Sequence, residues 1–199
     1  MLVLASASPR RRELLTQAGY QFSIHPAHIP EDPHPNEDPI AYVTRLAQQK
    51  AQAVFNHLAE SATDPDLQVL GADTTVTLDN QILGKPENEA DAARMLRILS
   101  GRTHRVITGV ALVTPVRTEV AAEVTAVQFL TLSEQEIAAY IATGEPNDKA
   151  GAYAIQGHAA RWIPRIQGCY FNVVGLPISL VATLLDAANQ LTRKARQLR

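Results

Sequence analysis

The stretch that decides the fold is residues 1–15, MLVLASASPRRRELL. Its apolar residues 2–5 predict a short strand. Ser8 then has the character of a helix N-cap, with Pro9 at the first helical position, where its missing N–H costs nothing. A helix is therefore expected from about residue 8 to residue 18, closed by Gly19. A strand that leads directly into a helix is typical of α/β folds.

Strand and helix patterns continue to alternate along the rest of the chain. Period-two and apolar runs predict strands at 20–24, 67–73, 104–115, 119–130 and 161–166, and a hairpin at 74–86. Helical spacing and capping residues predict helices at 40–60, 88–100, 133–144 and 176–191. Prolines between residues 26 and 39 predict an irregular loop there. We expect one α/β domain over residues 1–199, with a mixed twisted sheet, flanking helices and two lobes around a cleft.

Composition and charge exclude several classes of protein. The chain is 46% hydrophobic and 19% charged, which is ordinary for a globular domain. A net charge of −2 argues against a general nucleic-acid binder, and a single cysteine excludes an internal disulfide framework. No apolar run approaches the roughly 18 residues of a membrane span, and no leader-like segment precedes the first strand. We expect a cytoplasmic protein without a nucleic-acid or membrane partner.

Three arginines occupy the first turn of the first helix, where the helix dipole favours carboxylates over cations. The turn also offers free backbone N–H groups and the hydroxyls of Ser6 and Ser8, and arginine forks match phosphate oxygens. Alternatively, the arginines Arg10–Arg12 point to solvent or pair with surface acids. Three cations at the unfavourable helix end favour the interpretation that Ser8, Arg10 and Arg11 bind phosphate.

Asp73 follows the apolar run 67–72 and is expected at the carboxyl end of that strand, the edge where α/β sheets place ligands. A carboxylate there can hold a divalent metal or act as a general base toward water. Alternatively, Asp73 is a turn residue that bonds the backbone around Thr74 and Thr75.

Four further residues have the chemistry of a phosphate or base site, each with a plain alternative. Lys50 borders the apolar stripe of its helix and otherwise extends its ammonium to water. Lys85, in the loop after the hairpin, is otherwise a surface lysine. Glu31, in the proline-rich loop, is a candidate metal ligand or a solvated acid. Gln156 lies in the glycine-rich run 151–157, where its amide suits the edge of a base or simply closes a turn.

Taken in order, the stretches LASASPRR, LAQQKA, GADTTV, GKP, LSGRTHRVITGVAL, DKAGAYAIQG and NVVGLP strongly resemble the Maf family, from Leu4 to about Pro177. The resemblance implies a nucleoside triphosphate pyrophosphatase, which cleaves the triphosphate to the monophosphate and pyrophosphate with a divalent metal, Mg²⁺ or Mn²⁺. It also implies an α/β fold like that of inosine triphosphate pyrophosphatases.

The same resemblance implies roles for the candidate residues. Asp73 would orient and deprotonate the attacking water, and Asp73 and Glu31 would hold the metal. Lys50 and Lys85, with the arginines, would neutralise the triphosphate.

Substrate preference also follows from the resemblance. The family form that acts on dTTP and UTP carries arginine, threonine and glutamine at three positions, which here are Arg10, Thr74 and Gln156. The form that acts on 7-methyl-GTP carries tryptophan, glutamine and glutamate there. We therefore expect a small-molecule pyrimidine nucleotide as substrate.

Two alternatives remain open at this stage. One is a non-catalytic, nucleotide-binding regulator of cell division, because the family also carries a septum-inhibition label. The basic stretch 193–199 could be cited for it, but we interpret that stretch as a solvated helix end. The other is a phosphatase that releases orthophosphate. Asp73 together with Lys50 and Lys85 favours the pyrophosphatase over both alternatives. For the oligomeric state, a homodimer is compatible with the sequence.

Overall fold

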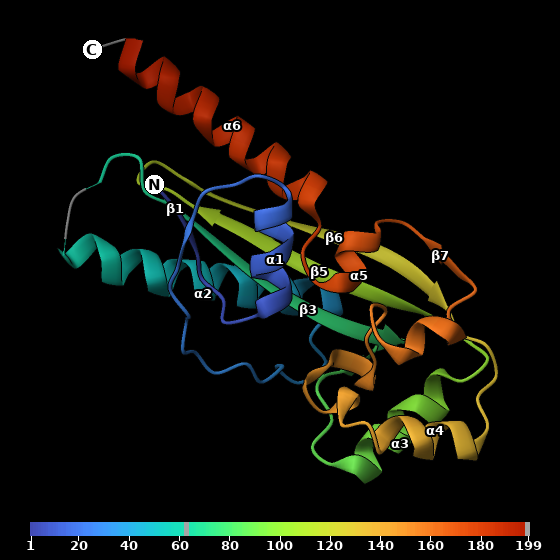
Figure 1. The fold of residues 1–199 in the computed structure, drawn as a ribbon. Coiled ribbons are helices and arrows are strands. Elements are labelled where there is room, and N and C mark those ends of the chain that lie inside the picture. Colours follow the sequence, from blue (N-terminus) through green and yellow to red (C-terminus); the bar gives the residue numbers. More distant parts are fainter. Residues whose placement is uncertain (62–63, 198–199) are drawn as a thin grey trace. The chain divides into compact units, whose positions relative to one another are not determined.

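The computed structural model of the protein describes residues 1–61 and 64–197 (Figure 1). Its strands are β1 (Leu2–Leu4), β2 (Ser23–Ile24), β3 (Gln68–Leu78), β4 (Gln81–Leu83), β5 (Thr103–Val113), β6 (Thr118–Gln128) and β7 (Arg165–Gln167). Its α-helices are α1 (Pro9–Gln17), α2 (Pro39–Ser61), α3 (Glu89–Leu99), α4 (Glu134–Ile141), α5 (Tyr170–Val174) and α6 (Ile178–Gln197). Short 3-10 helices are η1 (Glu145–Asp148), η2 (Ala150–Ala152) and η3 (His158–Trp162).

The strands form one seven-stranded sheet in the order β2-β1-β3-β5-β6-β7, with β4 paired to β3. Strand β1 is parallel to both β2 and β3, with Leu4 opposite Leu70. Strand β4 is antiparallel to β3, and β7 is antiparallel to β6. The sheet is therefore mixed, which confirms the expected α/β class with helices flanking a mixed sheet.

Two compact units divide the chain. Unit 1 comprises residues 1–73, 108–123 and 175–199, and unit 2 comprises residues 74–107 and 124–174. Strands β3, β5 and β6 contribute residues to both units. This division agrees with the two lobes expected from the sequence, while the cleft and the single domain over 1–199 stay predictions.

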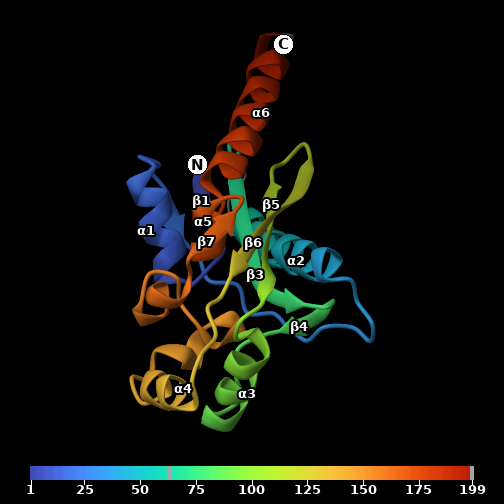
Figure 2. The same ribbon diagram turned by 90° about the vertical axis from the view of Figure 1, so that its right-hand side faces the viewer.

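In unit 1, helices α1 and α2 lie on opposite sides of β1 and β3 (Figure 2). Helix α2 lies directly on the sheet because two strand positions are glycine. A Cβ on Gly71 of β3 would overlap the carbonyl oxygen of Ala47, and one on Gly109 of β5 would overlap the carbonyl of Val43. Close helix–strand approach at these glycines sets the height of α2 above the sheet.

In unit 2, helices α3 and α4 pack side by side (Figures 1 and 2). Its core contains an aromatic cluster in which Phe129 and Tyr153 lie 4.8 Å apart between ring centroids, and Tyr140 and Trp162 lie 5.0 Å apart. The buried ring of His104 joins the cluster, and its Nε2 lies 2.8 Å from the Tyr153 hydroxyl. Tilted and edge-on ring contacts of this kind stabilise a core beyond simple burial.

Three sequence predictions need correction. The expected strand at 161–166 is shorter, because η3 extends to Trp162 and pairing begins only after Pro164, which has no N–H to donate. The strand expected at 20–24 is reduced to Ser23–Ile24. Helix α5 was not predicted, because five residues are too few for a periodic signal.

Helix α6 follows the prediction for 176–191 and continues to Gln197. The side chains of the basic stretch 193–199 lie outside the described residues, so its interpretation stays a prediction. Within residues 1–61 and 64–197, no helix combines the length and the apolar character that crossing a bilayer requires.

Candidate functional site

Asp73 lies inside β3, not at its end as expected, because the strand continues through Leu78 into the hairpin with β4. Residues 74–78 alternate between the two faces of the sheet, so β3 continues into the hairpin with β4 without a break. The parallel neighbour β1, however, ends at Leu4, which pairs with Leu70. Asp73 is therefore three residues past the point where the parallel pairing stops, and its residue is only 7% exposed. A ligand site at this edge of the sheet stays a prediction.

Lys50 does not extend to water. Its Nζ lies 2.7 Å from Oδ1 of Asp73 and 2.7 Å from Oε1 of Glu31, and the residue is 6% exposed. The close contact between Gly71 and α2 brings Lys50 near Asp73, because α2 packs directly on β3 two residues before Asp73. Three predicted site residues that are far apart in the sequence are thus in contact, because the carboxylates of Asp73 and Glu31 share the buried ammonium of Lys50.

The loop that carries Glu31 is fixed by α2. The Tyr42 hydroxyl donates to the backbone oxygen of Glu31 at 2.9 Å, and Arg45 Nη2 donates to the backbone oxygen of Asp32 at 3.2 Å. Arg45 also forms a two-pronged pair with Glu37, at 2.6 and 2.7 Å, which lowers the pKa of that carboxyl to about 2. Tyr42 and Arg45 were not predicted from the sequence, although their i, i+3 spacing places both on one helix face.

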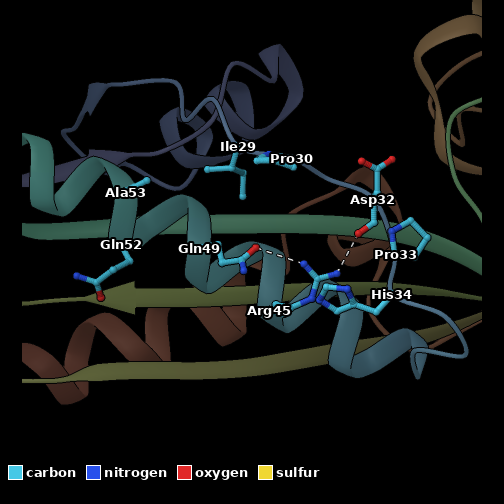
Figure 3. Close-up of a pocket in the computed structure, with 9 residues that line it drawn as sticks. All are labelled: Ile29, Pro30, Asp32, Pro33, His34, Arg45, Gln49, Gln52 and Ala53. Carbon is cyan, nitrogen blue, oxygen red and sulfur yellow. Dashed lines mark hydrogen bonds between the residues drawn. The ribbon is translucent and has the colours of Figure 1, made fainter.

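A pocket of about 580 Å³ lies between this loop and α2 (Figure 3). It is lined by Ile29, Pro30, Asp32, Pro33, His34, Arg45, Gln49, Gln52 and Ala53. Arg45 spans it, reaching both the Asp32 backbone and the Gln49 side chain (Figure 3). Asp73, Lys50 and Glu31 do not line this pocket. The loop therefore turns Glu31 toward Lys50 and its neighbours toward the pocket.

The arginine turn forms as predicted at its cap, where Ser8 Oγ accepts from the Arg11 N–H at 3.5 Å. The Arg11 side chain folds back instead of pointing to solvent. Its Nη1 donates to the Ala72 carbonyl at 2.9 Å and to Ser6 Oγ at 3.2 Å, and its Nε donates to the Gly175 carbonyl at 2.9 Å. These hydrogen bonds tie α1 to β3, and the Arg11 guanidinium interacts electrostatically with Asp73.

Charge and burial act together on this group of residues. Burial lowers the pKa of the Arg11 guanidinium, which the charge of Arg10 lowers further, whereas the carboxylates of Asp73 and Glu31 oppose the shift. Burial also raises the pKa of Tyr42 to about 12, and the same two carboxylates add to that rise. Tyr42 therefore stays a neutral hydrogen-bond donor at neutral pH. The candidate site is thus a small region of mixed, closely opposed charges.

Three predicted residues belong to unit 2. Thr74 follows Asp73 in β3 and is half-buried, and Lys85 is exposed in the loop after β4. The neighbouring Gly84 carbonyl accepts from the Gly151 N–H at 3.0 Å, so this loop is tied to the glycine-rich segment. Gln156 is exposed at the tip of a turn in that segment.

The carboxylates of Asp73 and Glu31 fit a divalent cation in part. Mg²⁺ is commonly bound by one or two carboxylates, with water and substrate phosphate completing its coordination. Within residues 1–61 and 64–197, no cluster of three or more His, Cys, Asp or Glu side chains is placed to bind a metal. The two carboxylates also contact the same ammonium, so Lys50 and a metal would compete for them.

A family model described as Maf-like protein matches residues 1–188. The chain belongs to the Maf family. A "dTTP/UTP pyrophosphatase" of Koribacter versatilis is 53% identical over 190 residues, covering 96% of this chain and 95% of the relative. Another of that name, from Geobacillus sp., is 52% identical and covers 89% of this chain and 92% of the relative. A third, from Bacillus pumilus, is 46% identical.

Among solved structures, the Ham1 protein of Staphylococcus aureus matches with a TM-score of 0.48 and 10% identity, over 94% of this chain and 98% of that chain. The expected likeness to the fold of inosine triphosphate pyrophosphatases stays a prediction.

Proposed function

We propose that this Maf protein is a nucleoside triphosphate pyrophosphatase that hydrolyses dTTP and UTP to the monophosphate and pyrophosphate. The observation that carries the proposal is the near full-length match to relatives named "dTTP/UTP pyrophosphatase" at about half identity. The shared ammonium of Lys50 between Asp73 and Glu31 supports it, because it gathers the residues such a reaction needs. As a nucleotide-sanitising enzyme, the protein would act on a small-molecule substrate.

The triphosphate would be bound through positive charge. Ser8 and Arg10 stand at the N-terminus of α1, where backbone N–H groups and the dipole favour an anion. Arg11 adds a positive charge behind this turn, where its guanidinium donates to the carbonyls of Ala72 and Gly175. Lys50 and Lys85 would complete the neutralisation of the polyphosphate.

Asp73 would act as the general base. It takes a proton from water as the water oxygen bonds to the α-phosphorus, and the bond from that phosphorus to the bridging oxygen breaks to release pyrophosphate. A divalent cation, Mg²⁺ or Mn²⁺, bound by Asp73 and Glu31, would supply further positive charge at the phosphate oxygens. Lys50 would hold both carboxylates in position before substrate binds.

The preference for dTTP and UTP would depend on Gln156, with Arg10 and Thr74. A pyrimidine with a 4-oxo group presents an acceptor beside the N3–H donor, and a glutamine amide complements both. Cytosine inverts this pattern. Mispaired polar groups cost about 1–3 kcal/mol each, which predicts a roughly tenfold to hundredfold preference for dTTP over dCTP.

Product analysis tests the proposal. The protein is incubated with dTTP, UTP, dCTP, GTP and 7-methyl-GTP in Mg²⁺, and pyrophosphate and orthophosphate are measured separately. We expect pyrophosphate and the monophosphate in equal amounts, fastest from dTTP and UTP. Orthophosphate as the direct product would indicate a phosphatase. Tight binding without turnover would indicate a nucleotide-binding regulator. The cytoplasmic location and the homodimer stay predictions.

A further inference from the structure

The turn that carries Gln156 is held at both ends by one pair of side chains, the buried Tyr140 and the half-buried Glu145. Tyr140 of α4 donates its hydroxyl proton to Oε1 of Glu145 at 2.7 Å. The same hydroxyl oxygen accepts from the backbone N–H of Ala154 at 3.2 Å. The other carboxylate oxygen, Oε2, accepts from the backbone N–H of His158 at 3.1 Å. The anchored amides lie two residues before and two residues after Gln156.

A glycine completes the fit. A Cβ on Gly157 would overlap the carboxylate of Glu145, so the chain passes directly against this group. The Gly157 N–H closes the turn on the Ala154 carbonyl at 3.1 Å. The turn is therefore fixed by its own hydrogen bond and by the Glu145 carboxylate, which leaves no room for a side chain at Gly157.

We call Tyr140 and Glu145, with their hydrogen bonds to the Ala154 and His158 amides, the clamp; their chemistry keeps these bonds in place at neutral pH. The Tyr140 ring is 2% exposed, and burial followed by its hydrogen bond to Glu145 raises the pKa of the phenol, so the hydroxyl remains a donor at neutral pH. A carboxylate that accepts from both a hydroxyl and an amide makes charge-assisted bonds, which are stronger than neutral ones. The hydrogen bonds from this pair to the turn go to backbone N–H groups, those of Ala154 and His158.

We propose that Tyr140 and Glu145 are positioning residues for substrate selection, which hold the Gln156 turn so that its amide meets the pyrimidine edge in one place. This inference rests on the proposed function of Gln156. A glutamine amide can present its oxygen and NH₂ in either order, so a loosely held side chain would accept thymine or cytosine. The partners that select one order of the amide can act only when the backbone that carries it lies in a fixed place, as in other sites held by surrounding hydrogen bonds.

The test compares Tyr140→Phe and Glu145→Gln with the unmodified protein. The first keeps the ring but removes the hydroxyl, and the second keeps the shape but removes the charge. For each we measure kcat/KM for dTTP and for dCTP, with Gln156→Ala as the reference for complete loss of selection. We expect both substitutions to lower the dTTP-to-dCTP ratio by about tenfold. The double variant should lose little more, because both changes break one clamp.

Glu136→Gln is the matched control. Its carboxylate also accepts from a backbone N–H, but from that of Ser133 in the capping box of α4. This variant should lose some stability and keep the substrate ratio. Amide hydrogen exchange gives an independent reading: protection should fall at Ala154 in Tyr140→Phe and at His158 in Glu145→Gln.

The outcomes separate the two proposals. If the unmodified protein prefers dTTP and both variants keep its ratio, or shift it no more than Glu136→Gln does, the positioning role is wrong and the proposed function stands. If the unmodified protein hydrolyses neither dTTP nor UTP, the proposed function fails and the positioning role with it. A lowered ratio in both variants, with the matching loss of amide protection, supports the clamp.

Discussion

At the scale of single residues, Lys50 is the group on which the candidate site depends. Its ammonium contacts a carboxylate from β3 and another from the proline-rich loop, each at 2.7 Å. Removal of one partner from a buried ion pair leaves an uncompensated charge, which destabilises a protein far more than loss of a surface pair. Lys50 is therefore a structural residue in addition to the catalytic role proposed for it.

Lys50→Met should lower the free energy of unfolding by about 3 kcal/mol, measured by urea denaturation without metal. Mg²⁺ should raise the melting temperature of this variant more than that of the unmodified protein, because the cation can occupy the space between Asp73 and Glu31. Arg97→Met, which breaks an exposed pair with Glu134, serves as the control and should show neither effect. Equal stability of Lys50→Met and the unmodified protein would rule out this role.

His104 is a second residue whose charge matters, in the core of unit 2. Burial lowers the pKa of His104 to about 4 from its ordinary 6.5, so the folded state holds the ring neutral. The unfolded chain binds the proton first as pH falls. The stabilisation is therefore complete above pH 6.5 and is lost between about 6.5 and 4.

Unfolding measured from pH 7 to pH 4 should show this loss at a slope of about 1.4 kcal/mol per pH unit from His104 alone. His104→Gln should flatten the profile in that window, since glutamine can still bond the Tyr153 hydroxyl but does not titrate. Parallel profiles for His104→Gln and the unmodified protein would show that His104 does not titrate in this way.

At the scale of elements, the site exists because α2 lies directly on β3. Gly71 allows this contact, and the neighbouring positions on the helix, Ala47 and Ala51, are small as well. A side chain at Gly71 would displace the helix that carries Lys50. The distance from Lys50 to Asp73 therefore depends on a residue that touches neither substrate nor metal.

Gly71→Ala should lower the free energy of unfolding by about 1–3 kcal/mol, the usual range for overpacking. It should also reduce dTTP hydrolysis, because the added methyl group moves α2 away from β3. Gly84→Ala is the control for stability, since a Cβ there would meet open space. A Gly71→Ala protein with unchanged melting temperature and activity would contradict the packing argument.

Elements that carry their own start signals were predictable from sequence. Ser8, Asn88 and Ser133 cap α1, α3 and α4 as their positions suggested, each accepting a backbone N–H. Short elements such as β7 and α5 have no comparable signal. The meeting of Lys50 with Asp73 and Glu31 was beyond prediction from spacing, because it follows from how α2 packs on the sheet.

The arginine turn likewise has one part that could be predicted from the sequence and one part that could not. Its cap and its unfavourable charge were visible in the sequence, and they led to phosphate as the ligand. The carbonyls of Ala72 and Gly175, which accept from Arg11, come from distant parts of the chain. Sequence alone therefore identified Arg11 as unusual but not its role in joining α1 to β3.

At the scale of the whole molecule, one family spans residues 1–188, and the residues predicted for the site come from both units. Unit 1 holds the carboxylates, Lys50 and the arginine turn, and unit 2 holds the Gln156 turn and Lys85. Under the proposed function, charge chemistry and base selection therefore depend on residues of different units. This division predicts that changes in the unit 2 clamp alter selection among nucleotides, whereas changes at Asp73 abolish turnover of every nucleotide.

The most direct test of the central claim is pyrophosphate release from dTTP by Asp73→Asn at saturating Mg²⁺. Asparagine keeps the size and much of the hydrogen bonding of Asp73 but removes the charge needed for a general base or a metal ligand. Loss of a general base costs about 10²–10⁴-fold in rate, so we predict a fall of that size in kcat, with a melting temperature showing that the variant is folded. Turnover within a few-fold of the unmodified protein would contradict the account.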